Sequence, residues 1–244
     1  MKTILVTGGT SPPGRLTVAT LRAAGHSVRV LSRKPGDLRG DLTTGEGVAA
    51  ATEGVDTVIH LATSRGHADV QAEHLIEQAR AAGVGHLIFL SIVGVDRVPM
   101  PYYRDKLAVE QLITEFPFSI LRATQFHNLV DEILTMQRFL PFLLAPAVPL
   151  QPISVKDVAE RLAELAEGPP AGRVPDLGGP EQLTFPTLAR AWKHAKHSRR
   201  PVLPIRLPGK AFRAYATGAA LLPTGRPGPH TFEDYLTERF GVQA

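Results

Sequence analysis

The fold is decided near the start of the chain, where Ile4 to Gly14 read Ile-Leu-Val-Thr-Gly-Gly-Thr-Ser-Pro-Pro-Gly and Ser27 to Lys34 read Ser-Val-Arg-Val-Leu-Ser-Arg-Lys. The apolar run predicts a buried strand, the glycines predict a turn, and an amphipathic helix leads to a second strand that ends in two cations. A helix N-terminus after a buried strand attracts anions, because its N–H groups lack partners and its dipole is positive there. This order therefore predicts dinucleotide binding.

The glycine turn departs from the usual dinucleotide-binding pattern. Gly8 and Gly14 hold the first and third glycine positions, but Ser11 stands at the middle one. Pro12 and Pro13 follow, and neither has an N–H to donate, although proline is tolerated at a helix start. The turn residues that we expect to contact a cofactor are Gly8, Thr10, Ser11, Pro12, Pro13 and Gly14.

Two readings of this turn stay open. In the first, the Thr10 and Ser11 hydroxyls and Arg15 replace the missing backbone donors. In the second, the segment is a tight strand-to-helix turn that no longer binds a nucleotide. The first reading is the one we follow, because the whole strand–turn–helix–strand unit is present.

The composition is that of an ordinary globular protein. The chain has 244 residues, of which 43% are hydrophobic and 20% charged, with a formal net charge of +4 and a pI near 9.6. It has no cysteine, which excludes disulfides, thiolate zinc sites and cysteine nucleophiles. The most apolar stretch, 139–150, contains three prolines and is shorter than the roughly 20 residues that a membrane-spanning helix needs. We expect a cytoplasmic monomer or homodimer with no metal, nucleic-acid or membrane partner.

Strands and helices alternate along the chain, which predicts a Rossmann-type α/β fold with a doubly wound parallel sheet. We expect a single NAD(P)-binding domain over 1–244, with a nucleotide-binding body at 1–124 and substrate-side helices forming a small covering lobe at 125–244. The expected strands are 3–7, 27–31, 57–62, 86–91, 118–122 and 174–177. The expected helices are 15–24, 47–52, 67–82, 104–116, 125–139, 155–167, 183–197 and 212–222.

Several residues follow the carboxyl ends of these strands, where such sheets bind ligands. Arg33 and Lys34 follow the second strand, where an NAD-preferring site would place an acid, so they favour the 2′-phosphate of NADP over NAD. The alternative is that both cations are solvated turn residues. Further expected cofactor contacts are Asp41, Leu42, Ala62 and Thr63.

A second informative segment contains Ser91 and, after a gap, Tyr102 and Lys106. The i, i+4 spacing of Tyr102 and Lys106 puts them on one face of a helix. An ammonium beside a phenol favours the phenolate, so Tyr102 could transfer a proton to a substrate oxygen that Ser91 orients. Lys106 would also bind the nicotinamide ribose. The alternative is an exposed tyrosine and lysine at a helix start.

Features that suggest a substrate site are fewer. Gln125, Phe126 and His127 follow the strand expected at 118–122 and should face the nicotinamide. His127 either donates to a substrate oxygen or is a hydrogen-bonded residue at a helix start. Phe142 belongs to an apolar group that forms either a lid over an apolar ligand or ordinary packing.

The chain resembles the atypical short-chain dehydrogenase/reductases of the NmrA-like, NAD(P)H-binding branch. The segments that carry the resemblance are 6–14, 40–42, 54–62, 91–96, 102–106, 120–126 and 152–159. The resemblance implies a Rossmann-type fold and NADP(H) binding. The family that it resembles includes quinone and enone reductases as well as regulators that bind the cofactor without turnover.

Together these features predict an NADP-dependent oxidoreductase that reduces a carbonyl, enone or quinone-like group of an apolar small molecule. The alternative is a redox sensor that binds NADP(H) and acts through a protein partner. Lys193, Lys196, Arg199 and Arg200 form a cationic cluster that could serve such a partner or could be a solvated helix end.

Overall fold

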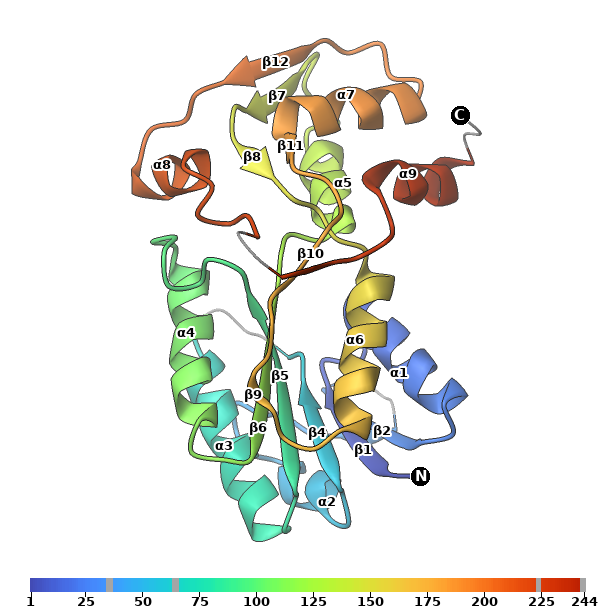
Figure 1. Ribbon diagram of the computed structural model, residues 1–244, viewed down its shortest axis with the longest axis vertical. Helices are drawn as coiled ribbons and strands as arrows, with labels where there is room; N and C mark the ends of the chain where they lie inside the picture. The colour runs from blue at the N-terminus through green and yellow to red at the C-terminus, as the bar shows by residue number, and fades with distance from the viewer. Residues whose placement is uncertain (34–36, 63–65, 223–224, 242–244) are drawn as a thin grey trace. The chain divides into compact units, whose positions relative to one another are not determined.

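The computed structural model describes residues 1–33, 37–62, 66–222 and 225–241 (Figure 1). The chain forms two compact units, each built from several segments. Unit 1 comprises 1–92, 101–122 and 158–175, and unit 2 comprises 93–100, 123–157 and 176–244. The N-terminal half therefore supplies most of unit 1, while the second half supplies most of unit 2.

Unit 1 is organised around a parallel sheet in the order β6-β5-β4-β1-β2-β3, with β9 beside β6. Its strands are β1 (Thr3–Thr7), β2 (Ser27–Ser32), β3 (Leu38–Arg39), β4 (Thr57–His60), β5 (His86–Ile92), β6 (Phe118–Ala123) and β9 (Gly172–Arg173). The helices are α1 (Pro12–Ala23), α2 (Val48–Thr52), α3 (Ala68–Ala81), α4 (Pro101–Ile113) and α6 (Val155–Glu167). Figure 1 shows α3 and α4 on one side of the sheet and α1 and α6 on the other. The predicted Rossmann-type α/β fold is confirmed.

The inner strands of unit 1 are apolar because helices cover both faces of the sheet. Ile4, Leu5 and Val6 of β1 have no exposed surface, and the same is true of Val58 and Ile59 in β4. β1 lies between β2 and β4 in parallel register, so the strand order reverses beside it. Ligands in open α/β sheets bind at the carboxyl ends of the strands at such a reversal.

Unit 2 holds shorter elements around a buried tryptophan. Its strands are β7 (Leu143–Pro146), β8 (Pro149–Leu150), β10 (Leu177–Gly178), β11 (Leu183–Thr184), β12 (Val202–Ile205) and β13 (Arg226–Pro227), and its helices are α5 (His127–Met136), α7 (Phe185–Ala195), α8 (Lys210–Ala216) and α9 (Phe232–Phe240). Trp192 is fully buried and donates from Nε1 to Asp131 Oδ1 at 2.7 Å. Asp131 also accepts from the Tyr235 hydroxyl at 3.0 Å, so this carboxylate joins α5, α7 and α9.

Several details differ from the sequence-based expectations. The strand expected at 174–177 is not found there, since β9 ends at Arg173 and β10 begins at Leu177. α1 begins at Pro12 and not at residue 15, because proline suits the first helical positions. The helix expected at 212–222 is α8, which ends at Ala216 because Gly218 adopts the left-handed conformation with φ of 78°. β7, β12 and α9 were not expected. Pro146 in β7 and Pro204 in β12 weaken the sequence pattern of a strand in these two segments.

No helix in the described ranges combines the length and apolar character needed to cross a bilayer. Whether 125–244 covers a bound substrate stays a prediction.

Candidate functional site

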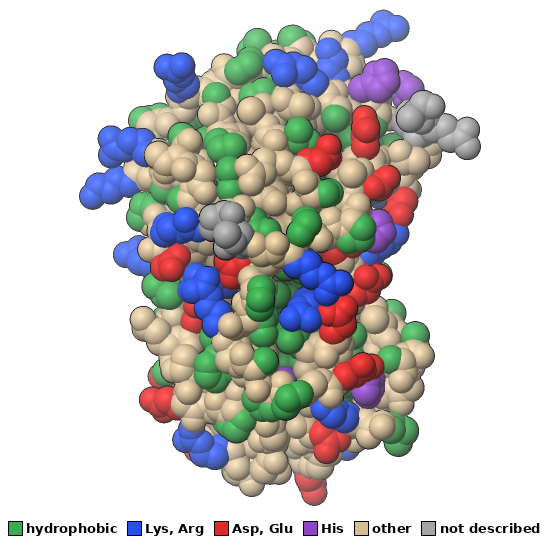
Figure 2. All heavy atoms as spheres, in the orientation of Figure 1, with side chains coloured by type: hydrophobic (Ala, Val, Ile, Leu, Met, Phe, Trp, Pro, Cys, Tyr) green, Lys and Arg blue, Asp and Glu red, His purple; other side chains and the backbone are tan. Residues whose placement is uncertain are grey.

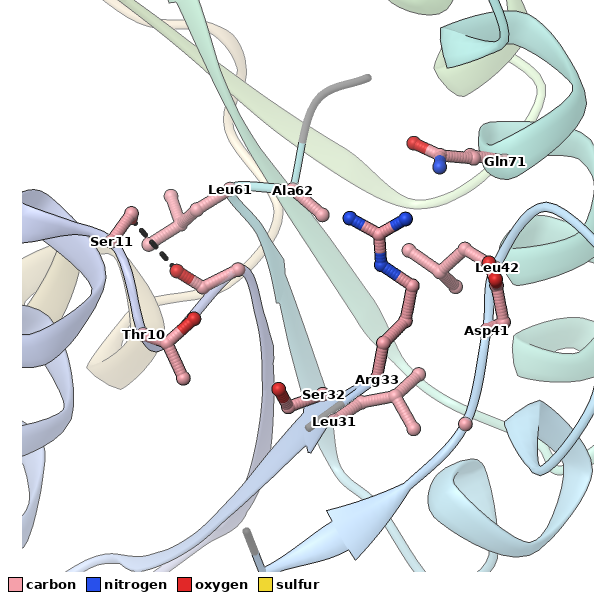
Figure 3. A pocket seen from close by; sticks show the side chains of 12 residues that line it. Thr10, Ser11, Leu31, Ser32, Arg33, Asp41, Leu42, Leu61, Ala62 and Gln71 are labelled. Atoms are coloured by element: carbon pink, nitrogen blue, oxygen red, sulfur yellow. Dashed lines mark hydrogen bonds between the residues drawn. The ribbon is translucent and has the colours of Figure 1, made fainter. Parts of the chain in front are cut away.

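A pocket of about 330 Å³ opens at the carboxyl ends of β1, β2 and β4 in unit 1 (Figure 3). This is the edge of the sheet at which the glycine turn was expected. The residues that line the pocket are Gly8, Thr10, Ser11, Leu31, Ser32, Arg33, Gly40, Asp41, Leu42, Leu61, Ala62 and Gln71. Seven of the residues predicted for cofactor binding therefore meet at one place: Gly8, Thr10, Ser11, Arg33, Asp41, Leu42 and Ala62.

The two glycines of the turn are required by close packing. Gly8 has φ of 72°, and a Cβ there would lie 2.6 Å from the Ala62 backbone nitrogen. A Cβ on Gly14 would lie 2.2 Å from the Gly8 carbonyl oxygen. Any side chain at these positions would push α1 or β4 away, since real contacts are never this short. Glycine at both positions therefore lets the chain turn sharply after β1 and lets α1 pack close to the turn.

The N-terminus of α1, in contrast, is closed. The Ser11 N–H donates to Gly8 O at 3.0 Å, and Pro12 and Pro13 have no N–H. The Gly14 N–H donates to Ser11 Oγ at 3.2 Å. The four positions that usually offer backbone donors to a pyrophosphate are thus bonded internally or lack a donor, in a segment that the structure describes completely.

The Ser11 hydroxyl does not replace these donors in this structure. Its one proton goes to Gly8 O at 2.8 Å, the interaction drawn as a dashed line in Figure 3. α7 starts in the same way, with Pro186 in its first turn and the Thr184 hydroxyl accepting from the Thr187 N–H. α1 is therefore capped like an ordinary structural helix. An anion would have to be held by Thr10, by the remaining amides of the turn, or by arginine side chains.

Arg33 reaches the pocket from the end of β2. Figure 3 shows its guanidinium between Ala62, Leu42 and Gln71, opposite the glycine turn. Its five donors in a planar fork suit a phosphate. Lys34 and Thr63, also predicted to contact the cofactor, lie outside the described residues.

The far side of the pocket is built by the loop after β3 and by α3. The Asp41 carboxylate accepts from the Thr43 N–H at 2.8 Å and so shapes this loop. Gln71 of α3 is 6% exposed and donates from Nε2 to Thr43 Oγ1 at 2.9 Å. The sequence reasoning missed Gln71. The sequence did contain an indication, because Gln71 lies four residues before Leu75, and this spacing puts a polar side chain on the buried face of the helix.

Tyr102 and Lys106 lie on one helix as predicted, because α4 begins at Pro101. Lys106 is 3% exposed, and its Nζ donates to Leu90 O at 2.8 Å and lies 4.4 Å from the centroid of the Phe89 ring. Tyr102 is half-buried and its ring meets that of Tyr103 edge-on. Neither residue is among those that line the pocket described above. The catalytic role of the pair stays a prediction.

Burial changes the charge of Lys106. It lowers the pKa of this amine to about 7, although the nearby Glu110 carboxylate raises it. The amine therefore loses its proton more readily than an exposed lysine does. His60, which bonds Thr7 Oγ1 at 2.8 Å and stacks on Phe89, is neutral, because burial and the Lys106 charge lower its pKa to about 3.

Ser91 lies within β5 and is 3% exposed. Among the described residues, its Oγ has no hydrogen-bond partner. A buried hydroxyl without a partner carries a free-energy cost, which a ligand oxygen at this position would relieve. This observation is compatible with the predicted orienting role of Ser91 and does not test it.

The residues predicted to face a substrate are held by bonds inside unit 2. Gln125 donates from Nε2 to Ala220 O and accepts from the Gln151 N–H at its Oε1. His127 is the first residue of α5, is 2% exposed and contacts Pro152 O through Nε2 at 3.1 Å. Burial lowers its pKa to about 4. These contacts favour the reading of His127 as a hydrogen-bonded residue at a helix start.

Two further predicted substrate residues are apolar. Phe126 pairs with Ile153 in an isolated bridge, and Phe142 is half-buried just before β7. No group of three or more His, Cys, Asp or Glu that could hold a metal ion occurs in the described ranges.

The chain is similar in sequence to several known proteins. Residues 8–169 match the family described as NAD(P)H-binding. The chain is 29% identical over 226 residues to the chloroplastic divinyl chlorophyllide a 8-vinyl-reductase of Oryza sativa subsp. indica, covering 75% of this chain and 56% of that protein. A stretch of 68 residues, 24% of this chain and 19% of the other, is 43% identical to a 3-beta-hydroxysteroid dehydrogenase of Mycolicibacterium neoaurum. The chain thus spans about half the length, or less, of the curated relatives it matches.

Solved structures share the fold at low sequence identity. The NADPH-dependent quinone oxidoreductase QOR2 of Escherichia coli, complexed with NADPH, superimposes with a TM-score of 0.80 at 16% identity, covering 97% of this chain and 99% of that one. A short-chain dehydrogenase/reductase superfamily protein of Agrobacterium tumefaciens with bound NAD gives 0.77 at 20% identity, covering 98% and 96%. Both similarities support the Rossmann-type fold.

Proposed function

Because this chain belongs to the NAD(P)H-binding family, we propose that it is an NADP-dependent oxidoreductase that reduces a carbonyl, enone or quinone-like group of an apolar small molecule. The observation that carries the cofactor preference is the position of Arg33, at the end of β2 and inside the pocket. An NAD-preferring site would place an acid there to bind the ribose 2′-hydroxyl.

The residues of the pocket fit the adenosine end of the cofactor better than its pyrophosphate. Leu42 and Ala62 provide apolar surface for the base, and Arg33 provides a guanidinium for the 2′-phosphate. At the glycine turn, the closed N-terminus of α1 gives a pyrophosphate fewer backbone donors than is usual. When bound, the nicotinamide ring supplies the hydride.

The relatives support the type of reaction. A vinyl reductase and a hydroxysteroid dehydrogenase are similar in sequence, and a quinone oxidoreductase is similar in fold. By their names they act on the vinyl group of a chlorophyllide, on a hydroxysteroid and on a quinone. The proposal for this chain takes over the reaction class and leaves the individual substrate open.

In the proposed reaction, Tyr102 donates the proton that accompanies hydride transfer, and Ser91 orients the substrate oxygen. Lys106 contributes a charge that is held less firmly than that of an exposed lysine, because its amine is buried and donates to Leu90 O. Lys106 therefore fixes the start of α4 against β5 as much as it stabilises a phenolate. His60 is neutral because its pKa is lowered to about 3, so it adds no positive charge beside Lys106.

The cofactor preference is tested by calorimetry with NADPH and NADH. A charge-assisted contact contributes about 1.5–3 kcal/mol, and less where the side chain is exposed, so Arg33→Ala should weaken NADPH binding about tenfold and leave NADH unchanged. Arg39→Ala, which removes an exposed arginine of β3 outside the pocket, is the matched control. Equal affinity of the unmodified protein for both cofactors would disprove the preference.

The second candidate function is a non-catalytic NADP(H) sensor that acts through a protein partner. The closed N-terminus of α1 favours it, since a weakly held cofactor suits a reporter of NADPH concentration. Absorbance at the nicotinamide band distinguishes the two functions. Oxidation of NADPH with any member of a panel of quinones, enones and aldehydes supports the reductase, and binding without turnover across the panel supports the sensor.

A further inference from the structure

β7 and β12 form a two-stranded parallel sheet in unit 2, and β7 is buried on one face. Leu143 and Ala145 have no exposed surface and belong to the core around Trp192. Alternate residues of a strand point to opposite faces, so Leu144 and its register partner Leu203 share the other face. Leu203 is 41% exposed and Leu144 is half-buried, so this second face is apolar and partly open to solvent.

The end of α5 and the loop that leads into β7 add more exposed apolar surface. Phe139 is 83% exposed and Met136 is 68% exposed. Arg200 donates from Nη1 to Gln137 O at 2.7 Å, which holds the loop before β12 against the loop before β7. Met1 aside, the large apolar side chains that are exposed by a third or more in the described ranges all belong to unit 2: Leu129, Met136, Phe139, Leu140, Leu203 and Leu207.

The same two segments are basic. Residues 136–146 and 198–207 contain no Asp or Glu, and their cations are Arg138, Arg199, Arg200 and Arg206. From 182 to 232 the chain has nine Lys and Arg and no acidic residue. Figure 2 shows Lys and Arg side chains over the part of unit 2 where β12 and α7 lie. We call residues 136–146 and 198–207 the apolar-basic face.

We propose that the apolar-basic face binds the surface of an anionic lipid membrane. Phe139 and Leu203 would lie at the level of the headgroups and upper acyl chains, and the arginines would meet lipid phosphates. The Arg138 guanidinium lies 4.5 Å from the centroid of the Phe139 ring. With the ring inserted among the lipids, this guanidinium would lie at the level of the headgroup phosphates, as arginine side chains do at membrane interfaces. No membrane-spanning helix is needed for this mode of binding.

Other occupants fit the face less well. A second copy of the chain would bring two sets of arginines together with no acid between them. A nucleic acid would pair with the arginines but would leave Phe139 and Met136 in water, since backbone phosphates offer no apolar surface. The proposal differs from the sequence-based expectation of no membrane partner, and it is independent of the oxidoreductase assignment.

The test is cosedimentation of the full chain with vesicles of phosphatidylcholine alone and with a third phosphatidylserine. We expect binding only to the anionic vesicles, and weaker binding at higher salt. Each arginine near such a surface contributes about 1 kcal/mol, which is about fivefold in affinity, so Arg199→Ser with Arg206→Ser should weaken binding about 25-fold. Phe139→Ser should weaken it about tenfold, since most of its ring is free to insert.

The control removes the same charge elsewhere. Arg80→Ser with Arg104→Ser changes two exposed arginines of unit 1 and should leave vesicle binding unchanged. Circular dichroism confirms that each variant is folded. The proposal is overturned if anionic vesicles do not sediment the protein, if Phe139→Ser binds as well as the unmodified chain, or if the control loses as much affinity as the face variants. It is also overturned if the face variants instead abolish binding to duplex DNA or dissociate a dimer in size-exclusion chromatography.

Discussion

Opening the N-terminus of α1 should strengthen cofactor binding. Ser11→Gly releases the Gly14 N–H from the serine hydroxyl, and Pro13→Ala supplies an N–H where none exists. Both donors then point along the helix axis towards the N-terminus of α1, where the helix dipole favours an anion. The cost to the helix is small, since glycine at an N-cap loses only a few tenths of a kcal/mol relative to serine.

The magnitude follows from the bonds gained. One charge-assisted hydrogen bond from a backbone N–H to a phosphate contributes about 1.5–3 kcal/mol, and part of this is lost in freeing the Ser11–Gly8 contact. We therefore expect the double variant to bind NADPH about ten- to thirtyfold more tightly by calorimetry. Adenosine 2′-monophosphate lacks the pyrophosphate, so its affinity should not change.

Pro186→Ala in α7 is the matched control protein. Pro186 occupies the same position in a helix capped by Thr184, and it lies outside the pocket. This variant should bind NADPH like the unmodified chain. Unchanged or weaker NADPH binding by the Ser11→Gly, Pro13→Ala variant, with its fold intact, would refute the reasoning and would mean that the prolines preorganise the turn for the cofactor.

Three other predictions concern α4 and its neighbours. Tyr102→Phe should lower NADPH oxidation about 10²–10⁴-fold at unchanged NADPH affinity, and equal turnover would remove Tyr102 from the chemistry. Lys106→Met removes an amine whose pKa is about 7 in the folded chain and 10.5 in the unfolded chain. Between these pH values the unfolded state binds more protons than the folded state, so the folded state becomes more stable as the pH rises. From pH 7 to pH 10.5 the free energy of unfolding of the unmodified chain should rise by about 3–5 kcal/mol relative to that of the variant. A constant difference in urea unfolding across that range contradicts this. Glu110→Ala should lower the free energy of unfolding by about 3–5 kcal/mol, because it removes the carboxylate that the buried Arg122 guanidinium contacts at 2.6 and 2.8 Å. A decrease below about 1 kcal/mol in urea unfolding would contradict this prediction.

The parts of the fold that follow from local pattern were predictable. β1 was expected at 3–7 and is found at Thr3–Thr7, since a strand covered on both faces is a continuous apolar run between polar ends. α6 was expected at 155–167 and is found there, because its apolar residues recur at helical spacing. The turn between β1 and α1 was predictable for the same reason, with glycine at both positions that lack room for a Cβ.

Features that depend on distant contacts were not predictable. β12 pairs with β7 across more than fifty residues, and each strand contains a proline that weakens the local signal. The sequence also does not reveal that the Ser11 hydroxyl both donates and accepts within the turn. Likewise, the burial of Lys106 against Phe89 depends on how α4 packs on β5.

The closed turn and Arg33 together account for how this pocket would discriminate between cofactors. NADP and NAD share the pyrophosphate, so contacts to it cancel in the ratio of their affinities, and the ratio depends on the 2′-phosphate alone. Because α1 offers few donors, we expect the affinities for both cofactors to be low, with NADH bound more weakly than NADPH. Opening the turn should therefore tighten both cofactors by the same factor. Arg33→Ala should change their ratio in either background, because the two effects act on different phosphates.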